Sequence, residues 1–127
     1  KKLSLARDKD NVYVSISGET TGWIAVGFGS LKIDGALMFI GFVGADGKAQ
    51  GKLQMGKGRT HADVASDALV QFAMKEANGV TTLELVVKAA SILANDAKAL
   101  PMIWAVGGAD SFVSPHRSRG FLTVTLK

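Results

Sequence analysis

The chain has 127 residues, of which 47% are hydrophobic and 20% are charged, so it is long enough for one globular domain and too apolar for a disordered chain. It contains no cysteine, which excludes disulfides and thiolate metal sites. The net charge of +4 is spread along the chain instead of forming one basic stripe with interleaved aromatic residues, which argues against nucleic-acid binding. The longest apolar run, residues 36–43, is too short to cross a bilayer.

Alternation of apolar and polar residues recurs along the chain and is interrupted by many of its 15 glycines, which predicts short strands joined by tight turns. In chain order, we expect strands at residues 12–17, 21–28, 36–43, 48–55, 68–76, 81–88, 102–107 and 120–127. Residues 36–43 are nearly all apolar, which predicts a strand covered on both faces.

The segments between these strands also carry signals. Asp46-Gly47 and Asn78-Gly79 predict hairpin turns, because these pairs readily adopt the positive φ angles of such turns. Residues 56–67 are polar and are predicted to form a long loop, and the alanine-rich segment 89–99 a helical turn or crossover. No linker divides the chain, so we expect residues 1–127 to form one all-β domain, a sandwich or a barrel.

The chain shows no signal or targeting segment. It begins with Lys1 and Lys2, and we interpret it as either a mature protein or an excised domain.

Two enzyme-like patterns are incomplete. Residues 51–57 resemble a phosphate-binding loop, but Gly58 stands where that loop needs a serine or threonine, and no helix pattern follows. His61 and His116 could be combined with serines near residue 114, but no Gly-x-Ser-x-Gly turn presents a nucleophile. We therefore expect no enzymatic activity from this domain alone.

Two pairs of aspartates are conceivable calcium ligands. These are Asp8 with Asp10, and Asp63 with Asp67. Neither pair has the carboxylate density or spacing of a calcium loop, so we interpret them as solvated surface.

The segment Ser114–Gly120 combines a histidine with two arginines between two predicted strands. His116 follows a proline and is flanked by Arg117 and Arg119. A histidine placed in this way is either a surface residue or a metal ligand with cationic groups beside it.

Several segments together resemble the DOMON family, over a region from about residue 3 to the end of the chain. The resemblance is carried, in order, by residues 20–29 (TTGWIAVGFG), Gly35-Ala36, 41–43 (GFV), 46–48 (DGK), 103–107 (IWAVG) and 116–120 (HRSRG). It implies an immunoglobulin-like antiparallel β-sandwich that is extracytoplasmic, in the periplasm, secreted or at the cell surface. It also implies a domain that binds haem b, as cytochrome-type members do in electron transfer, or a sugar-like ligand.

The resemblance further implies axial ligands for the haem iron. In haem-binding members these are a histidine near the last strand, which His116 matches, and a methionine whose position falls on Ile33, which cannot bind iron. We favour Met38 as the second ligand. Met55, Lys32 and a protein with His116 as its single iron ligand remain the alternatives.

The haem hypothesis assigns the remaining candidate residues. The cofactor pocket would be lined near Ile33 by the aromatic residues Trp23, Phe28, Phe39 and Trp104. Arg117 and Arg119 would pair with the haem propionates or with an acidic redox partner.

Two alternatives to electron transfer remain open. A haem-free module that binds a carbohydrate or another small ligand would use Trp23, Trp104 and Tyr13 as stacking faces. A structural role in adhesion or assembly would leave no signature in the residues.

Overall fold

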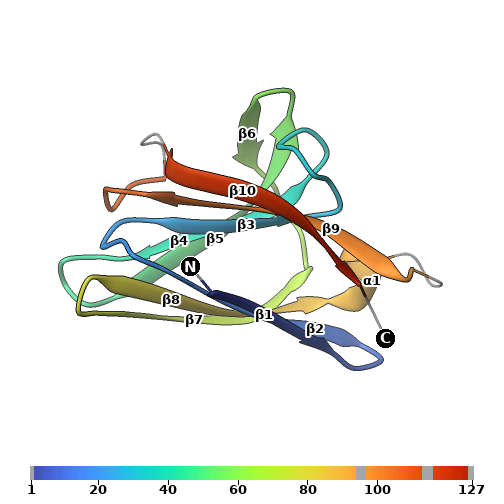
Figure 1. The fold of residues 1–127 in the computed structure, drawn as a ribbon, viewed down its shortest axis with the longest axis horizontal. Coiled ribbons are helices and arrows are strands. Elements are labelled where there is room, and N and C mark those ends of the chain that lie inside the picture. The colour runs from blue at the N-terminus through green and yellow to red at the C-terminus, as the bar shows by residue number, and fades with distance from the viewer. Residues whose placement is uncertain (1, 94–96, 113–115, 126–127) are drawn as a thin grey trace.

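The computed structural model describes residues 2–93, 97–112 and 116–125. The elements are β1 (Lys2–Arg7), β2 (Asn11–Gly18), β3 (Ile24–Phe28), β4 (Leu37–Val43), β5 (Ala49–Lys57), β6 (Thr60–Asp63), β7 (Leu69–Ala77), β8 (Val80–Lys88), α1 (Ala89–Ile92), β9 (Ala99–Gly107) and β10 (His116–Thr125). The strands form two antiparallel sheets that lie face to face (Figure 1). The predicted all-β sandwich is confirmed.

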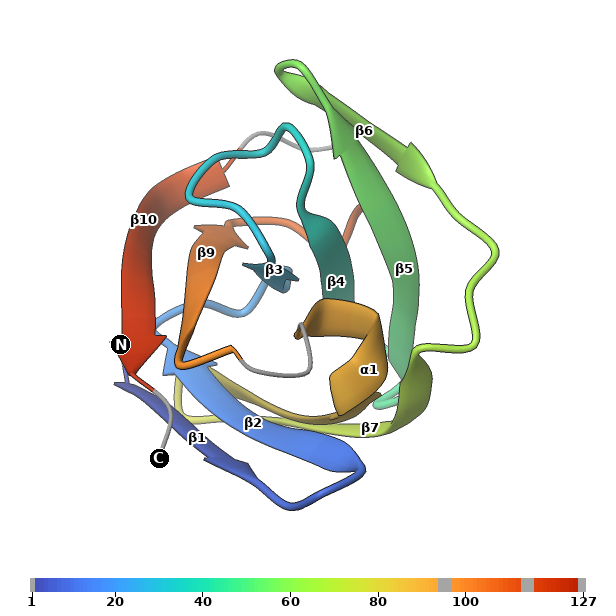
Figure 2. The same cartoon turned by 90° about the vertical axis from the view of Figure 1, so that its right-hand side faces the viewer.

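One sheet has four strands in the order β1-β2-β8-β7, and the other has six in the order β10-β9-β3-β4-β5-β6. Seen along the strands, β3 and β4 occupy the middle of the six-stranded sheet, between β9 and β5 (Figure 2). All neighbouring strands in both sheets are antiparallel.

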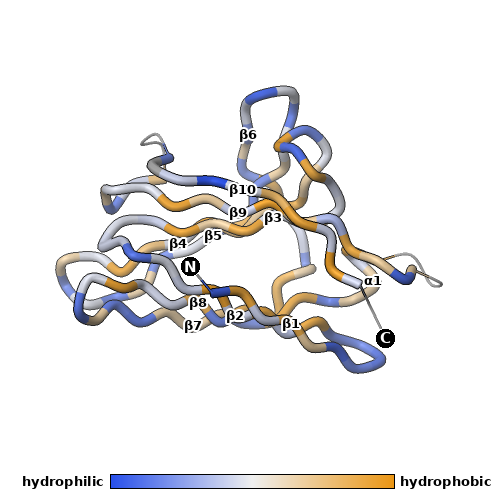
Figure 3. Tube along the Cα trace, viewed as in Figure 1, coloured by the Kyte–Doolittle hydropathy of each residue, from blue (hydrophilic) through white to orange (hydrophobic). Residues whose placement is uncertain are grey.

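The main core fills the space between the sheets. Alternate residues of β2 and β8 point inward and are buried, whereas the residues between them, such as Tyr13, Ser15, Thr82 and Glu84, are partly or fully exposed. Hydrophobic residues recur along the strands of both sheets (Figure 3), and buried side chains from both sheets form one core cluster. The largest fully buried side chains are Phe28, Phe39, Ile16, Ile24, Leu83, Leu85, Leu100 and Met102.

Strand β4 confirms the strongest expectation from the sequence, because all seven of its residues are buried. Its inward-facing residues join the main core, and its outward-facing residues are covered as well. The hairpin at Asn78-Gly79 is also confirmed, with φ angles of 56° and 78° at the two positions.

The structure differs from several expectations about the elements. Strand β1 was not predicted, and β6 lies inside the region 56–67 that we expected to be a loop. Gly58, with φ of 59°, instead turns the chain so that β6 pairs with the end of β5. His116 is the first residue of β10 and not part of a loop, because His116, Ser118 and Arg119 already pair with the end of β9.

Pro101 lies inside β9, although we expected it to precede that strand. Its carbonyl accepts a hydrogen bond from the amide of Gly29, just beyond the end of β3. The nitrogen of a strand residue points to the same side as its carbonyl, so the missing N–H of Pro101 faces a position where β3 has ended. The proline therefore lies at the end of the β3–β9 ladder, beyond the last paired residues Phe28 and Met102.

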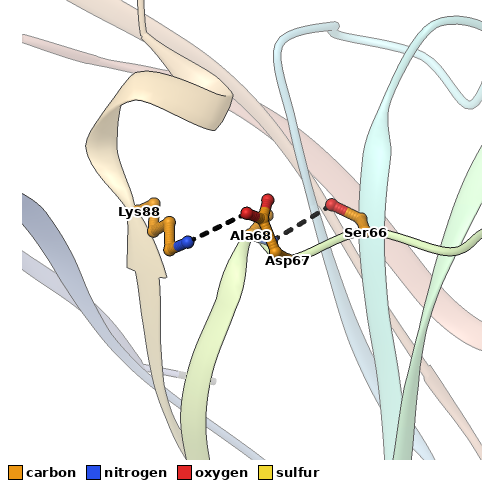
Figure 4. A network of polar contacts seen from close by, with 4 residues as sticks. All are labelled: Ser66, Asp67, Ala68 and Lys88. Carbon is orange, nitrogen blue, oxygen red and sulfur yellow. Dashed lines mark hydrogen bonds and ion pairs between the residues drawn. The ribbon is translucent and has the colours of Figure 1, made fainter.

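A polar network ties the segment before β7 to β8 (Figure 4). Lys88 Nζ lies 3.1 Å from Asp67 Oδ2, and the amide of Ala68 donates to Ser66 Oγ at 3.1 Å. The amide of Lys88 also donates to the carbonyl of Ala68 at 2.8 Å. The ion pair is exposed and adds little stability, but the backbone bond holds the fully buried Ala68 at the edge of the core.

No helix within the described part of the chain is long and apolar enough to cross a membrane.

Candidate functional site

The six-stranded sheet has a second apolar cluster on its outer face. Because side chains alternate along each strand, the neighbours of the core residues in β3, β4 and β9 point away from the sandwich. The cluster consists of Trp23, Ala25, Ile40 and Phe42, with Ala105 and Phe112 packed against it, and we call it the outer-face cluster. The rings of Phe42 and Phe112 lie 4.8 Å apart at 54°.

The sequence motif that precedes β3 holds the turn after β9 in place. Thr20 Oγ1 donates to the carbonyl of Gly107 at 2.6 Å and accepts from the amide of Gly22 at 3.0 Å. The amide of Trp23 donates to the carbonyl of Ala109 at 3.1 Å, and the amide of Gly107 donates back to the carbonyl of Trp23 at 2.9 Å. Three residues of the motif therefore position the chain where it turns toward β10.

Thr81 connects this arrangement to the other sheet. It is fully buried in β8, and its Oγ1 donates to the carbonyl of Thr20 at 2.7 Å. Thr20 is thus bonded to both sheets, because its own hydroxyl reaches Gly107 at the end of β9. This explains why two threonines are buried in an otherwise apolar interior.

His116 lies beside the outer-face cluster. It pairs with Gly107, and the Trp23 indole lies against Gly107 where a side chain would stand. Directly opposed residues of an antiparallel pair share a face, so His116 lies on the outer face and extends the side of the sheet that carries Trp23. The structure therefore brings together His116 and Trp23, which the sequence analysis proposed as ligand and pocket wall.

The two arginines follow His116 in β10. Arg119 is exposed and pairs with Ala105 of the outer-face cluster, so it also lies on the outer face. Arg117 falls between His116 and Ser118, where the register of the strand pair shifts, and its side chain lies outside the described part of the structure. Ser114 and Pro115 also lie outside the described residues.

Met38 lies on the same outer face, but far from His116. It pairs with Gly27 and is 7% exposed, and a Cβ on Gly27 would lie 3.1 Å from Met38 Cγ. From His116 to Met38 there are three strand spacings, from β10 through β9 and β3 to β4. There are also four residue steps along β9, from Gly107 to Ile103.

Strand spacings of about 4.8 Å and residue steps of about 3.3 Å put the Cα atoms of His116 and Met38 roughly 20 Å apart. This register does not place the two side chains on opposite sides of one iron ion.

The other candidates for the second ligand are dispersed. Met55 pairs with Leu37 and packs against the main core, so it faces the interior of the sandwich. Lys32 is exposed in the connection between β3 and β4, where its amide donates to Ser30 Oγ at 3.2 Å. Ile33 is half-buried in the same connection, and its carbonyl lies where a Cβ on Gly56 would stand.

Three of the predicted pocket aromatics are not on the outer face. Phe28 and Phe39 are buried in the main core, and Trp104 packs against that core with its indole close to Gly120. Tyr13 is 41% exposed on the four-stranded sheet, next to a shallow hollow of about 410 Å³. Trp23, Trp104 and Tyr13 therefore share no surface on which a sugar ring could stack.

The sequence analysis did not propose Phe112, Lys52 or Gln54 as site residues, and it interpreted Asp63 as solvated surface. Lys52 Nζ lies 4.4 Å from the centroid of the Phe112 ring and 2.9 Å from Asp63 Oδ1. Gln54 Nε2 donates to the same Asp63 oxygen at 2.9 Å. The hydrogen bond from Gln54, followed by the Lys52 ammonium, lowers the pKa of Asp63, so this carboxylate is ionised at neutral pH.

No signal in the sequence joins these residues, because β6 was read as a loop and Phe112 lies outside any alternating pattern.

Comparison with solved structures identifies the fold. The cytochrome domain of Myriococcum thermophilum cellobiose dehydrogenase aligns with a TM-score of 0.68 over 92% of this chain, at 12% sequence identity. The cytochrome b domain of pyranose dehydrogenase from Coprinopsis cinerea aligns with a TM-score of 0.67 over 91% of this chain, at 11% identity. This chain spans 66% and 68% of the two domains, respectively.

No protein-family model matches the sequence, and no curated protein matches it either. The β-sandwich fold implied by the DOMON resemblance is confirmed by these structural neighbours, both of which are cytochrome domains.

Proposed function

We propose that this domain binds a b-type haem on the outer face of its six-stranded sheet and transfers electrons. The observation that carries the proposal is the position of His116, which is exposed and lies beside Trp23 at the edge of an apolar cluster. Its place in a fold shared with two cytochrome domains supports the same conclusion.

The residues of the outer face fit such a group in their chemistry. A neutral imidazole is a common axial ligand of haem iron, and a strand-end position leaves the His116 ring accessible. The outer-face cluster offers Trp23, Phe42 and Phe112 as apolar contacts beside it. Arg119 lies on the same face and carries a charge suited to a propionate.

The residues of the outer face do not identify the second iron ligand. Met38 shares the outer face, but the register separates it from His116, so iron held by His116 and Met38 together would require the strands or the connecting segments to move. Met38, Met55 and Lys32 remain candidates, as does a site in which His116 is the only ligand. In that case, Ile33 would occupy the position where haem-binding DOMON members have their methionine ligand, and no other residue would replace that ligand.

When bound, the group would supply the one-electron chemistry, and the chain would supply its surroundings. Apolar contacts with Trp23 and Phe42 would provide most of the affinity, since each Å² of apolar surface removed from water contributes about 25 cal/mol. The same contacts would exclude water from the porphyrin face. Arg119 would hold a carboxylate at the rim, close to the surface where a partner must approach.

The biological setting is part of the same proposal. We propose an extracytoplasmic domain that exchanges electrons with a partner protein or a neighbouring domain and has no enzymatic activity by itself. The names of both structural neighbours refer to cytochrome domains of dehydrogenases, which supports a redox partner of that kind.

Absorption spectroscopy tests the proposal directly. Protein produced with haem available should show a Soret band that shifts and sharpens on reduction with dithionite. Acidified organic solvent should extract all of the haem, because the chain has no cysteine to hold it covalently. Haem-replete protein that stays colourless and takes up no added hemin would exclude this function.

A further inference from the structure

Two buried polar atoms at the β5–β6 hairpin have no hydrogen-bond partner among the described residues. They are Oε1 of Gln54, which is 5% exposed, and Nδ1 of His61. An amide oxygen can only accept hydrogen bonds or bind a cation, and buried polar groups are nearly always satisfied in folded proteins. Each atom therefore needs a partner other than the described side chains, and that partner is either a bound water or a cation.

The strand register places the side chains of Gln54, His61 and Asp63 on one face of the β5–β6 hairpin. Gln54 pairs with Asp63 across the two strands, and the hydrogen bond from Gln54 Nε2 to Asp63 Oδ1 shows that both side chains lie on the same face. His61 is two residues before Asp63 in β6, so it lies on that face as well. The hydrogen bond also fixes the orientation of the amide, because a carboxylate can only be bonded by its N–H side.

The backbone of the β3–β4 connection lies over Gly56, next to His61. Gly56 is paired with His61, and the carbonyl of Ile33 occupies the space where a side chain at Gly56 would stand. A larger residue at position 56 would push this connection away from His61. The Asp63 side chain itself is 68% exposed, so solvent reaches the carboxylate and screens the charge of a bound cation.

The contacts that Lys52 and Gln54 make with Asp63 involve only one of its two carboxylate oxygens. Lys52 Nζ and Gln54 Nε2 both bind Asp63 Oδ1, each at 2.9 Å. Within the described residues, neither contact reaches Oδ2 of Asp63. Lys52 also repels any cation bound there, so it should limit the affinity of the site.

We propose that Gln54 Oε1, His61 Nδ1 and Asp63 Oδ2 form a binding site for a divalent transition-metal ion such as Zn²⁺. Imidazole nitrogen and carboxylate oxygen are ordinary ligands of such ions. No three histidine, cysteine, aspartate or glutamate side chains in the described ranges converge on one point, so the Gln54 amide serves as the third protein ligand. Water completes the coordination, and binding is weaker than at a structural zinc site.

Zinc titration of the untagged, haem-free protein tests this site, with calorimetry for affinity and imidazole ¹⁵N NMR for the ligand. The chain has only two histidines, so each signal can be assigned from one variant. Zinc should bind with a stoichiometry of one and shift Nδ1 of His61, while the signals of His116 stay in place. Absence of zinc binding, or a shift confined to His116, overturns the proposal and leaves a bound water as the partner of the two atoms.

Variants separate a metal site from a structural effect. His61→Ala and Asp63→Asn should weaken zinc binding on the order of tenfold or more. Lys52→Gln should strengthen it, because the change removes a competing cation, and no loss of folding could produce that gain. Unchanged affinity in His61→Ala, or weaker binding in Lys52→Gln, contradicts the site.

His116→Ala is the matched control. It should leave zinc binding unchanged while it weakens or abolishes haem retention, so the zinc site and the proposed haem site can fail independently.

Discussion

The indole of Trp23 lies against the Cα of Gly107, so that a side chain at position 107 would overlap the ring. The two residues also exchange a backbone hydrogen bond, from the amide of Gly107 to the carbonyl of Trp23. This contact joins the start of β3 to the end of β9, and His116 pairs with Gly107 on its other side. The tryptophan of the family-like motif therefore supports the strand end where the candidate ligand begins.

Gly107→Ala should destabilise the domain by about 1–3 kcal/mol, because the added methyl group has to displace a packed indole. Urea unfolding followed by tryptophan fluorescence would measure the loss. Gly108→Ala is the matched control, since no atom lies within 4 Å of the position its Cβ would take. Equal stability of the two variants would show that the Trp23 indole can move aside without lowering the free energy of unfolding.

Thr81→Val should cost about 1–3 kcal/mol, although it preserves the shape of the side chain. The change removes the hydroxyl that donates to the carbonyl of Thr20, and it leaves that carbonyl buried without its side-chain donor. Thr82→Val, at the next and partly exposed position of β8, should change the stability by less than about 0.5 kcal/mol. Denaturant midpoints of both variants would distinguish the buried bond from a general effect of replacing threonine in this strand.

Asp8 and Tyr13 form a surface pair whose titration can be measured separately. Tyr13 Oη donates to Asp8 Oδ2 at 2.7 Å, and this bond is the main cause of the lowered pKa of Asp8 and the raised pKa of Tyr13. Tyr13 is the only tyrosine, so tyrosinate absorbance reports it alone. Asp8→Asn should lower the pKa of Tyr13 toward the ordinary value of about 10.

The same pair predicts a sign for the acid dependence of stability. A carboxylate whose pKa is lowered by folding stabilises the protein above its unfolded pKa of about 3.9, and this stabilisation is lost as the pH falls through the folded pKa. Wild-type protein should therefore lose more stability than Asp8→Asn in that acidic range. Asp46→Asn, in the turn after β4, is the control and should leave the tyrosinate titration as it is in the wild type.

Much of the fold could be predicted because its signals are local. The seven buried residues of β4 form an unbroken apolar run, and Asn78-Gly79 is a turn pair with a steric reason for its conformation. Strand β6 could not be predicted, because it is short and polar and forms only by pairing with β5. The sequence also placed the start of β10 too late, since the residues around His116 lack alternation.

The candidate site could be predicted only in part, for a different reason. Alternation shows which residues of a strand share a face, but β3 is buried on both faces, so it did not show that Trp23 faces outward while Phe28 faces the core. The separation of His116 from Met38 depends on the order of strands that are distant in the sequence. No local sequence pattern reveals the order of the strands in the sheet.

The second iron ligand is the last prediction, and one set of variants of haem-loaded protein separates the possibilities. His116→Ala should convert a six-coordinate low-spin spectrum to a high-spin one and weaken haem retention, or abolish retention if His116 is the only ligand. Met38→Leu nearly preserves volume and should cost less than about 1.5 kcal/mol in stability. If the Met38 thioether binds iron after a movement of the strands, this variant should also lower the reduction potential, because methionine ligation raises it.

The register favours an unchanged spectrum in Met38→Leu, since about 20 Å separates the Cα atoms of Met38 and His116. Met55→Leu is the matched control, because Met55 faces the main core. Lys32→Ala tests the exposed amine in the β3–β4 connection, and a spectral change in this variant alone would identify that amine as the ligand. If none of these three variants changes the spectrum, His116 is the only protein ligand among the candidates. A lower potential and altered spin state in Met38→Leu would instead show that the outer face rearranges around the haem, and the separation of the two strands would then describe only the haem-free protein.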